Sequence, residues 1–434
     1  MTNATNAGST DAGAGAGSDA GHPPAGSSVR MPWVVILVSL LAFPVAYMLS
    51  LTSAMDDSRL VLAAGVVFCG AMVPLTYPLV RCVAAGRDVY FYVFTVFAFT
   101  SLIDLLLALT IDGRTPVLLF YLREGEVYLS TPHGLWINVW DGTFHYACYL
   151  LLTAMMLRPA HSYACTRFRA VALVWAGSIL NSMIVLFVGS AVGTHAHHIK
   201  PSYLLNIPYA LFPTIFLVRV LQARPAPTAT APHAAKSKPT SAAVAPSIRK
   251  PMWHWLLDVP LLSLLCLCAC VCVVRALVVV RSRLPLAAWY GREAEAHLLD
   301  SNAYPTLQML NYAFYLLPFL CWAALHVWAG PADAQSASAS AHDVAATACF
   351  RDWSLFAVGA VLQGTFSYVG AALHQGGAFQ FKEWAAQSTQ PDAWNCFVVV
   401  NALLLLTPIL VCARMHMRSP SSAQQQQQAR VKAQ

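Results

Sequence analysis

The chain has 434 residues, of which 58% are hydrophobic and only 10% are charged, and its mean hydropathy is +0.57. Soluble domains are about 45–50% apolar and about 25% charged, so this composition excludes an ordinary soluble protein. The net charge is only +7 and the basic residues do not cluster on a polar surface, which argues against a nucleic-acid partner. The 12 cysteines form no CxxC pair, which excludes a zinc module and a disulfide-stapled fold. These exclusions leave a polytopic membrane protein.

The predicted elements are all helical. Residues 1–30 are mostly Gly, Ala, Ser, Thr and Asn, which predicts a disordered tail. Ten apolar runs follow, each near the roughly 20 residues that cross a bilayer as a helix. We expect them at 32–51, 60–80, 89–110, 135–157, 170–193, 202–221, 255–280, 305–328, 353–373 and 394–413. A linker rich in Pro, Ala, Ser and Lys is expected at 222–251, and a Gln-rich disordered tail at 416–434.

The basic residues predict the orientation of these helices. Of the 26 Lys and Arg residues, seventeen lie on the side that carries both tails and the linker, and eight lie on the opposite side. The remaining one, Arg275, lies inside an apolar run. Because Lys and Arg favour the cytosolic side, both termini are predicted to be cytosolic.

The chain carries an internal repeat. Tyr121–Leu129 (YLREGEVYL) recurs as Tyr290–Leu298 (YGREAEAHL), and Asn206–Arg219 recurs as Asn401–Arg414 with its Asn, Pro and Arg conserved in place between the two copies. Ordered matches of this kind indicate a duplication. Each half has four spans, so the two halves run in the same direction through the membrane. Parallel repeats of this kind argue against an alternating-access transporter.

Polar residues inside a bilayer are costly and are therefore functional candidates. The fourth run carries Asn138, Asp141 and His145 at spacings of three and four, which places them on one helix face. Asp141 and His145 could act as a base with its orienting partner, the stripe could contact a ligand, or it could simply fasten helices together. In the second half Asn311 and Tyr315 replace the acid and the imidazole, so any chemistry is expected in the first half.

Asp104 in the third run is the other intramembrane acid of the first half. We expect it to face the interior of the bundle and to pair with a polar side chain there, such as Asn181 or Asn206.

Four segments resemble the transmembrane 6 superfamily, whose members contain two EXPERA domains. They are FAFTSLIDL at 97–105, YLREGEVYL at 121–129, WDGTFHY at 140–146 and AYPTLQMLNYAFYLLPF at 303–319. The resemblance runs from residue 32 to about 415. It implies two N-terminal helices at 31–82 and two parallel four-helix EXPERA repeats at 87–221 and 252–415. It also implies residence in the endoplasmic reticulum (ER) and the ER–Golgi intermediate compartment, with the lysosomal membrane as the alternative.

The wider EXPERA group includes the sigma-2 receptor and emopamil-binding protein, a sterol isomerase that uses a His and two Glu. Carried over by resemblance, the isomerase His falls on Ser101, its first Glu falls beside Asp104, its second Glu on Asp141, and a pocket Trp on Tyr209. The essential imidazole is therefore not matched, and His145 lies elsewhere.

By resemblance we expect a regulator of triglyceride secretion and lipid-droplet content that binds a lipid or sterol. The alternatives are a sterol isomerase using Asp104, Asp141 and His145, and a lipid transporter. No metal or cofactor is expected. The expected partners are membrane lipids or sterols and lipoprotein-assembly proteins of the ER. The expected ligand contacts are Ser101, Asp104, Asn138, Asp141, His145, Asn181, Asn206 and Tyr209.

Overall fold

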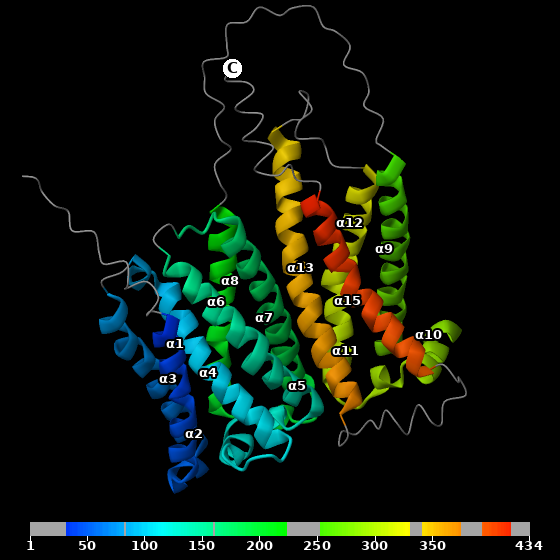
Figure 1. The fold of residues 1–434 in the computed structure, drawn as a ribbon. Coiled ribbons are helices and arrows are strands. Elements are labelled where there is room, and N and C mark those ends of the chain that lie inside the picture. The colour runs from blue at the N-terminus through cyan, green and yellow to red at the C-terminus, as the bar shows by residue number, and fades with distance from the viewer. Residues whose placement is uncertain are drawn as a thin grey trace, which may run out of the picture.

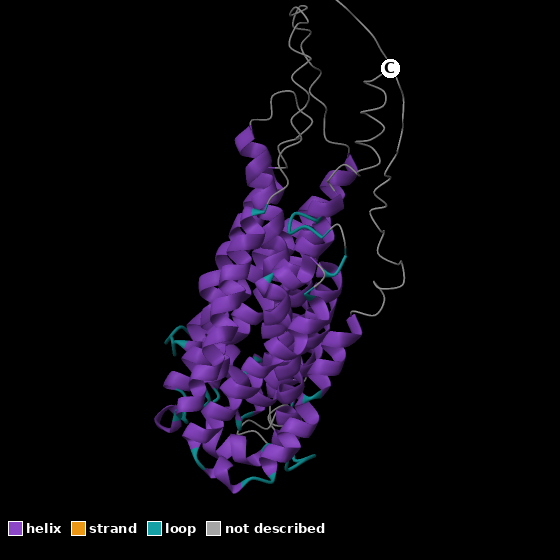
Figure 2. Ribbon diagram, turned by 90° about the vertical axis from the view of Figure 1, so that its left-hand side faces the viewer, coloured by secondary structure: helices purple, strands orange, loops and turns teal. Residues whose placement is uncertain are grey.

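The computed structural model describes residues 32–81, 84–158, 161–223, 252–329, 341–374 and 393–417. Within these ranges every regular element is helical and no strand occurs (Figure 2). The chain is thus an all-α membrane protein, as its composition predicts. The expected tails at 1–30 and 416–434 and the expected linker at 222–251 lie almost wholly outside the described residues.

The N-terminal part and the first half form one side of the bundle (Figure 1, blue to green). Their helices are α1 (Pro32–Leu40), α2 (Ala42–Ser50), α3 (Ser58–Val80), α4 (Val89–Ile111), α5 (Pro132–Trp140), α6 (Tyr146–Met156), α7 (Thr166–Val192) and α8 (Ile207–Gln222). A π-helical turn, Asp141–His145, joins α5 to α6 into one run. Side-chain caps begin several of these helices: Asp57 accepts from the backbone N–H of Arg59, and Asp88 from that of Tyr90.

The second half forms the other side (Figure 1, green to red). Its helices are α9 (Met252–Val279), α10 (Pro285–Trp289), α11 (Ala303–Asn311), α12 (Leu317–Ala329), α13 (Ala341–Leu373) and α15 (Ala393–Met417). Here too a π-helical turn, Tyr312–Leu316, joins α11 to α12. The π turn between paired helices therefore recurs in both halves.

Nine helices in the described part of the chain are long and apolar enough to cross a membrane. They correspond to nine of the ten expected spans. The other, the run α5–α6 from Pro132 to Met156, is as long as its neighbours but is not among the nine. It carries the polar stripe Asn138, Asp141 and His145, which lowers its hydropathy.

The two halves meet where α7 packs against α13, the most buried helices among the nine (Figure 1). Gly177 of α7 lies against the carbonyl oxygen of Phe356, and Gly359 of α13 lies against that of Val174, with no room for a Cβ at either glycine. Small residues allow this close approach of two backbones within a membrane.

Polar contacts hold the same interface. At one end Arg169 donates to Asp352 through two hydrogen bonds of 2.7 and 2.6 Å. Near the middle of α7, Asn181 donates to Gln363 at 2.5 Å and accepts from Asn311 at 2.6 Å. These side chains are at least half-buried and pair across the interface, so they fasten the halves together.

Candidate functional site: an apolar cavity with an acidic end

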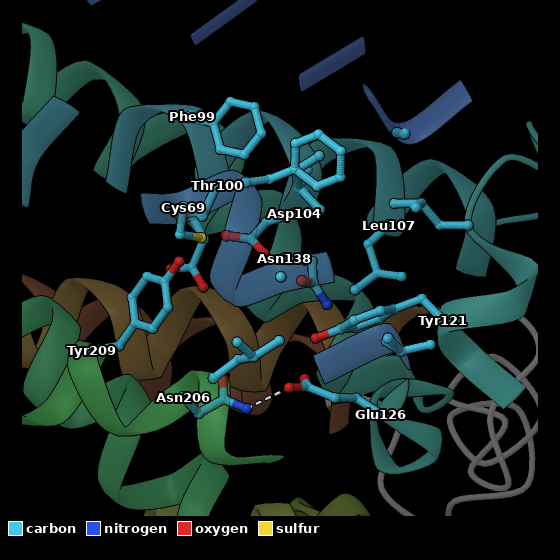
Figure 3. Close-up of a pocket in the computed structure, with 18 of the residues that line it drawn as sticks. Cys69, Phe99, Thr100, Asp104, Leu107, Tyr121, Glu126, Asn138, Asn206 and Tyr209 are labelled. Carbon is cyan, nitrogen blue, oxygen red and sulfur yellow. Dashed lines mark hydrogen bonds between the residues drawn. The ribbon is translucent and has the colours of Figure 1, made fainter. Parts of the chain in front are cut away.

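A cavity of about 350 Å³ lies in the first half, where α2 and α3 cover α4, α5 and the start of α8. This volume is within the range of small-molecule pockets, roughly 300–1,000 Å³. Its walls are mainly apolar and include Val45, Leu49, Phe68, Val96, Phe97, Phe99, Ile103, Leu107, Leu118, Ile137 and Met183. Figure 3 shows the residues around its polar part.

Three acids and two amides supply most of the polarity of this cavity. They are Asp104 from α4, Glu126 from the connection after α4, Asn138 and Asp141 from the α5–α6 run, and Asn206 at the start of α8. No Lys or Arg is among the lining residues. The cavity therefore combines an apolar body with acidic and amide groups, without a basic partner in its walls.

The connection that carries Glu126 is held in place by contacts on both sides. Ser202 Oγ donates to the carbonyl of Gly125 at 2.8 Å, and Lys200 Nζ pairs with Glu124 at 2.5 Å on the outer side. A Cβ on Gly125 would lie 2.8 Å from the ring of Tyr121, so a larger residue at this position would force that ring to move. The connection thereby points one glutamate outward to a lysine and the next acid inward to the cavity.

Glu126 is a buried acid of the cavity and is hydrogen-bonded to an amide. Its side chain is 3% exposed, and its Oε1 accepts a hydrogen bond of 2.5 Å from Asn206 Nδ2 (Figure 3). Asn206 Nδ2 also lies 3.0 Å from the hydroxyl of Tyr128. Burial raises the pKa of Glu126 to about 7, against the effect of the Asn206 hydrogen bond. Near neutral pH this carboxyl can therefore either accept or donate a hydrogen bond.

Asp141 and His145 form a pair, but only the acid lines the cavity. Asp141 Oδ1 lies 2.5 Å from His145 Nδ1, and His145 Nε2 lies 2.7 Å from Ser178 Oγ on α7. The indole of Trp140 donates to the same Ser178 hydroxyl at 2.8 Å. Both ring nitrogens of the buried imidazole are thus engaged, and its position is that of a support that orients Asp141.

The structure divides the eight predicted ligand contacts into two groups. The cavity is lined by Asp104, Asn138, Asp141, Asn206 and Tyr209, the last stacked on Phe97 with ring centroids 4.5 Å apart. Ser101, His145 and Asn181 are buried elsewhere. The expected pairing of Asp104 with Asn181 or Asn206 is wrong, because those amides bond to the inter-half cluster and to Glu126 instead.

Two contributions to the cavity are not predicted from the sequence. The sequence marks Glu126 only as part of the repeat, although the recurrence of an acid at that place in both halves is a signal for it. The N-terminal helices also line the cavity, through residues such as Cys69 of α3 (Figure 3). No sequence signal predicts this, because α3 is a plain apolar span.

The chain resembles known proteins over most of its length. The family model "Transmembrane 6 superfamily member 2-like, transmembrane domain" matches residues 41–231. The chain is 31% identical over 405 residues to Transmembrane 6 superfamily member 2 of Mus musculus, covering 90% of this chain and 96% of that protein. The Homo sapiens protein of that name is 32% identical over 381 residues, 88% and 91% of the two chains. No solved structure matches. The similarity over nearly the whole of both chains shows that this chain belongs to the transmembrane 6 superfamily.

Proposed function

We propose that this protein binds a sterol or another amphipathic lipid in the first-half cavity and thereby regulates lipid handling in the ER and the ER–Golgi intermediate compartment. The handling in question is triglyceride loading into secreted lipoproteins and the lipid-droplet content of the cell. Its partners in this role are membrane lipids and lipoprotein-assembly proteins of the ER. The observation that carries the proposal is an apolar cavity among membrane-spanning helices whose walls also carry hydrogen-bonding groups.

The chemistry of the cavity supports a ligand with an apolar body and a small polar group. Phe97, Phe99 and the other apolar walls match a hydrocarbon or ring system, whose burial is favourable by about 25 cal/mol per Å². Glu126 and Asn206 offer an acceptor and a donor to a hydroxyl group. A sterol alcohol meets both requirements, whereas a triglyceride has no hydrogen-bond donor.

The alternative function, sterol isomerisation, receives less support. Moving a double bond requires a proton donor and a proton acceptor that both reach the substrate. His145 is 1% exposed, does not line the cavity and has both ring nitrogens engaged. The cavity has carboxyls in its walls but no imidazole, so the His of the isomerase has no counterpart there.

Photo-crosslinking with a sterol probe tests the proposal. Glu126→Gln keeps the volume and the bond to Asn206 but removes the charge, so we expect crosslinking to fall on the order of 10-fold, because hydrogen bonds to charged groups contribute about 1.5–3 kcal/mol. Glu124→Gln, two residues away, makes the same change on the outer side and keeps an oxygen that can accept from Lys200, so it is the matched control and should crosslink normally. A wild-type protein that captures no sterol probe and co-purifies with no lipid by mass spectrometry would overturn the proposal.

We also propose that both termini face the cytosol. The excess of Lys and Arg on the side of the tails supports this orientation. The ends of α8 and α15 and the start of α9 also lie at one end of the bundle (Figure 1), as a linker and a C-terminal tail on one side require. Protease added to intact microsomes should remove a C-terminal epitope. Survival of that epitope until detergent is added would contradict the orientation.

A further inference from the structure

The two halves of the chain place the same acid–amide pair at the same point of the repeat. Glu126 and Asn206 in the first half correspond to Glu295 and Asn401 in the second. Asn206 donates to Glu126 at 2.5 Å, and Asn401 donates to Glu295 at 3.4 Å. Both carboxylates are buried, at 3% and 1% exposure. Each half of the duplication therefore contains a buried glutamate that accepts a hydrogen bond from an asparagine.

The second site differs in what faces its acid. Arg275 of α9 donates to Glu295 from Nε at 2.8 Å and from Nη2 at 2.5 Å. The same Nη2 donates to Asn401 Oδ1 at 3.0 Å, and the guanidinium lies over the ring of Tyr368, 5.5 Å from its centroid. Arg275 is 1% exposed. Its guanidinium thus has a bidentate carboxylate, an amide and an aromatic ring as partners. Proteins recognise guanidinium groups through bidentate carboxylates and aromatic rings.

Besides Arg275, Glu295 has two tyrosine partners. The hydroxyls of Tyr290 and Tyr368 each donate to its carboxylate at 3.0 Å. In the first half Glu126 has no basic residue in the cavity walls, and empty space of about 350 Å³ adjoins it. The acid of one half thus adjoins a cavity, and the corresponding acid of the other half is paired with the Arg275 side chain.

We propose that Arg275 is an internal ligand: the second half retains a cation-binding site, built by Glu295, Asn401 and Tyr368, that the chain's own guanidinium occupies. At Glu295 the chain's own guanidinium therefore takes the place of an external cation, whereas Glu126 in the first half adjoins a cavity. Once the Arg275 side chain is removed, the vacated site accepts a small planar cation such as methylguanidinium. This inference concerns the second half alone and does not depend on the ligand of the first-half cavity.

The test measures the thermal stability of the purified full-length chain with methylguanidinium. Arg275→Ala leaves Glu295 buried and unpaired, so its melting temperature should fall well below that of the wild type. Added methylguanidinium should raise it in a saturable manner by roughly 3 to 6 °C. Methylurea, which has a similar shape but no charge, should have no such effect, and neither compound should stabilise the wild type.

The double variant Arg275→Ala/Glu295→Gln is the matched control, because it removes the cation and the charge that binds it. We expect it to be more stable than Arg275→Ala and insensitive to methylguanidinium. If Arg275→Ala folds only when expressed with methylguanidinium, that rescue also supports the proposal. Equal responses of the single and double variants, no response of a folded Arg275→Ala protein, or failure of both variants to fold with the cation present would overturn it.

Discussion

Gly359→Leu is expected to abolish the packing of α7 on α13 and to cause a large loss of stability. A Cβ at this position would overlap the carbonyl oxygen of Val174, which is backbone and cannot rotate away. Overpacking usually costs about 1–3 kcal/mol. Here the helices must also separate, which weakens the Arg169–Asp352 pair and the Asn181 cluster, so we expect a loss above roughly 3 kcal/mol.

The expected result is a protein that no longer elutes as a single species in mild detergent. Gly177→Leu should behave similarly, because its Cβ would overlap the carbonyl oxygen of Phe356. Gly70→Leu is the matched control: it lies within α3, and no heavy atom lies within 4 Å of a Cβ placed there. A Gly359→Leu protein as stable and monodisperse as Gly70→Leu would show that the close approach of α7 and α13 is not required for folding.

Thr100→Trp is expected to abolish ligand binding while leaving the fold intact. Thr100 lines the cavity from α4, and its hydroxyl donates to the carbonyl of Phe97 in the same helix at 3.1 Å (Figure 3). An indole in this position would extend into the cavity and would not overlap packed side chains, so it should cost little stability. The same ring excludes any ligand from the centre of the cavity.

Thr100→Trp should therefore lose sterol crosslinking, while its melting temperature stays within a few degrees of that of the wild type. The control is Thr214→Trp on α8, where an exposed threonine also donates to a carbonyl of its own helix, that of Ala210. We expect that variant to crosslink normally. Normal crosslinking by Thr100→Trp would place the ligand outside this cavity.

The sequence by itself determined the membrane class and the positions of the spans. Apolar runs of about 20 residues must become helices in lipid, because a helix satisfies its backbone hydrogen bonds within one segment. The expected runs at 89–110 and 394–413 accordingly match α4 (Val89–Ile111) and α15 (Ala393–Met417) to within a few residues. This prediction depends only on local composition, which is why the sequence sufficed.

The composition of the site was decided by tertiary structure. Asn138 and Asp141 could be singled out because a polar residue in an apolar span is conspicuous, but their helix does not tell which neighbour they face. His145 bonds to Ser178 on α7, and Asn181 bonds to Gln363 on α13. Both partners lie far away along the chain, so the sequence does not reveal them.

Glu126 is the clearest case of a residue whose own segment does not reveal its neighbours. Its segment also contains Arg123 and Glu124, and in sequence all three read as residues of a polar connection between spans. Only the contact of Ser202 with Gly125 and of Lys200 with Glu124 turns one acid outward and buries the other beside Asn206. Which carboxylate lines a cavity, and which one pairs with a buried residue such as Arg275, follows from the packing of distant helices and not from the composition of any one segment.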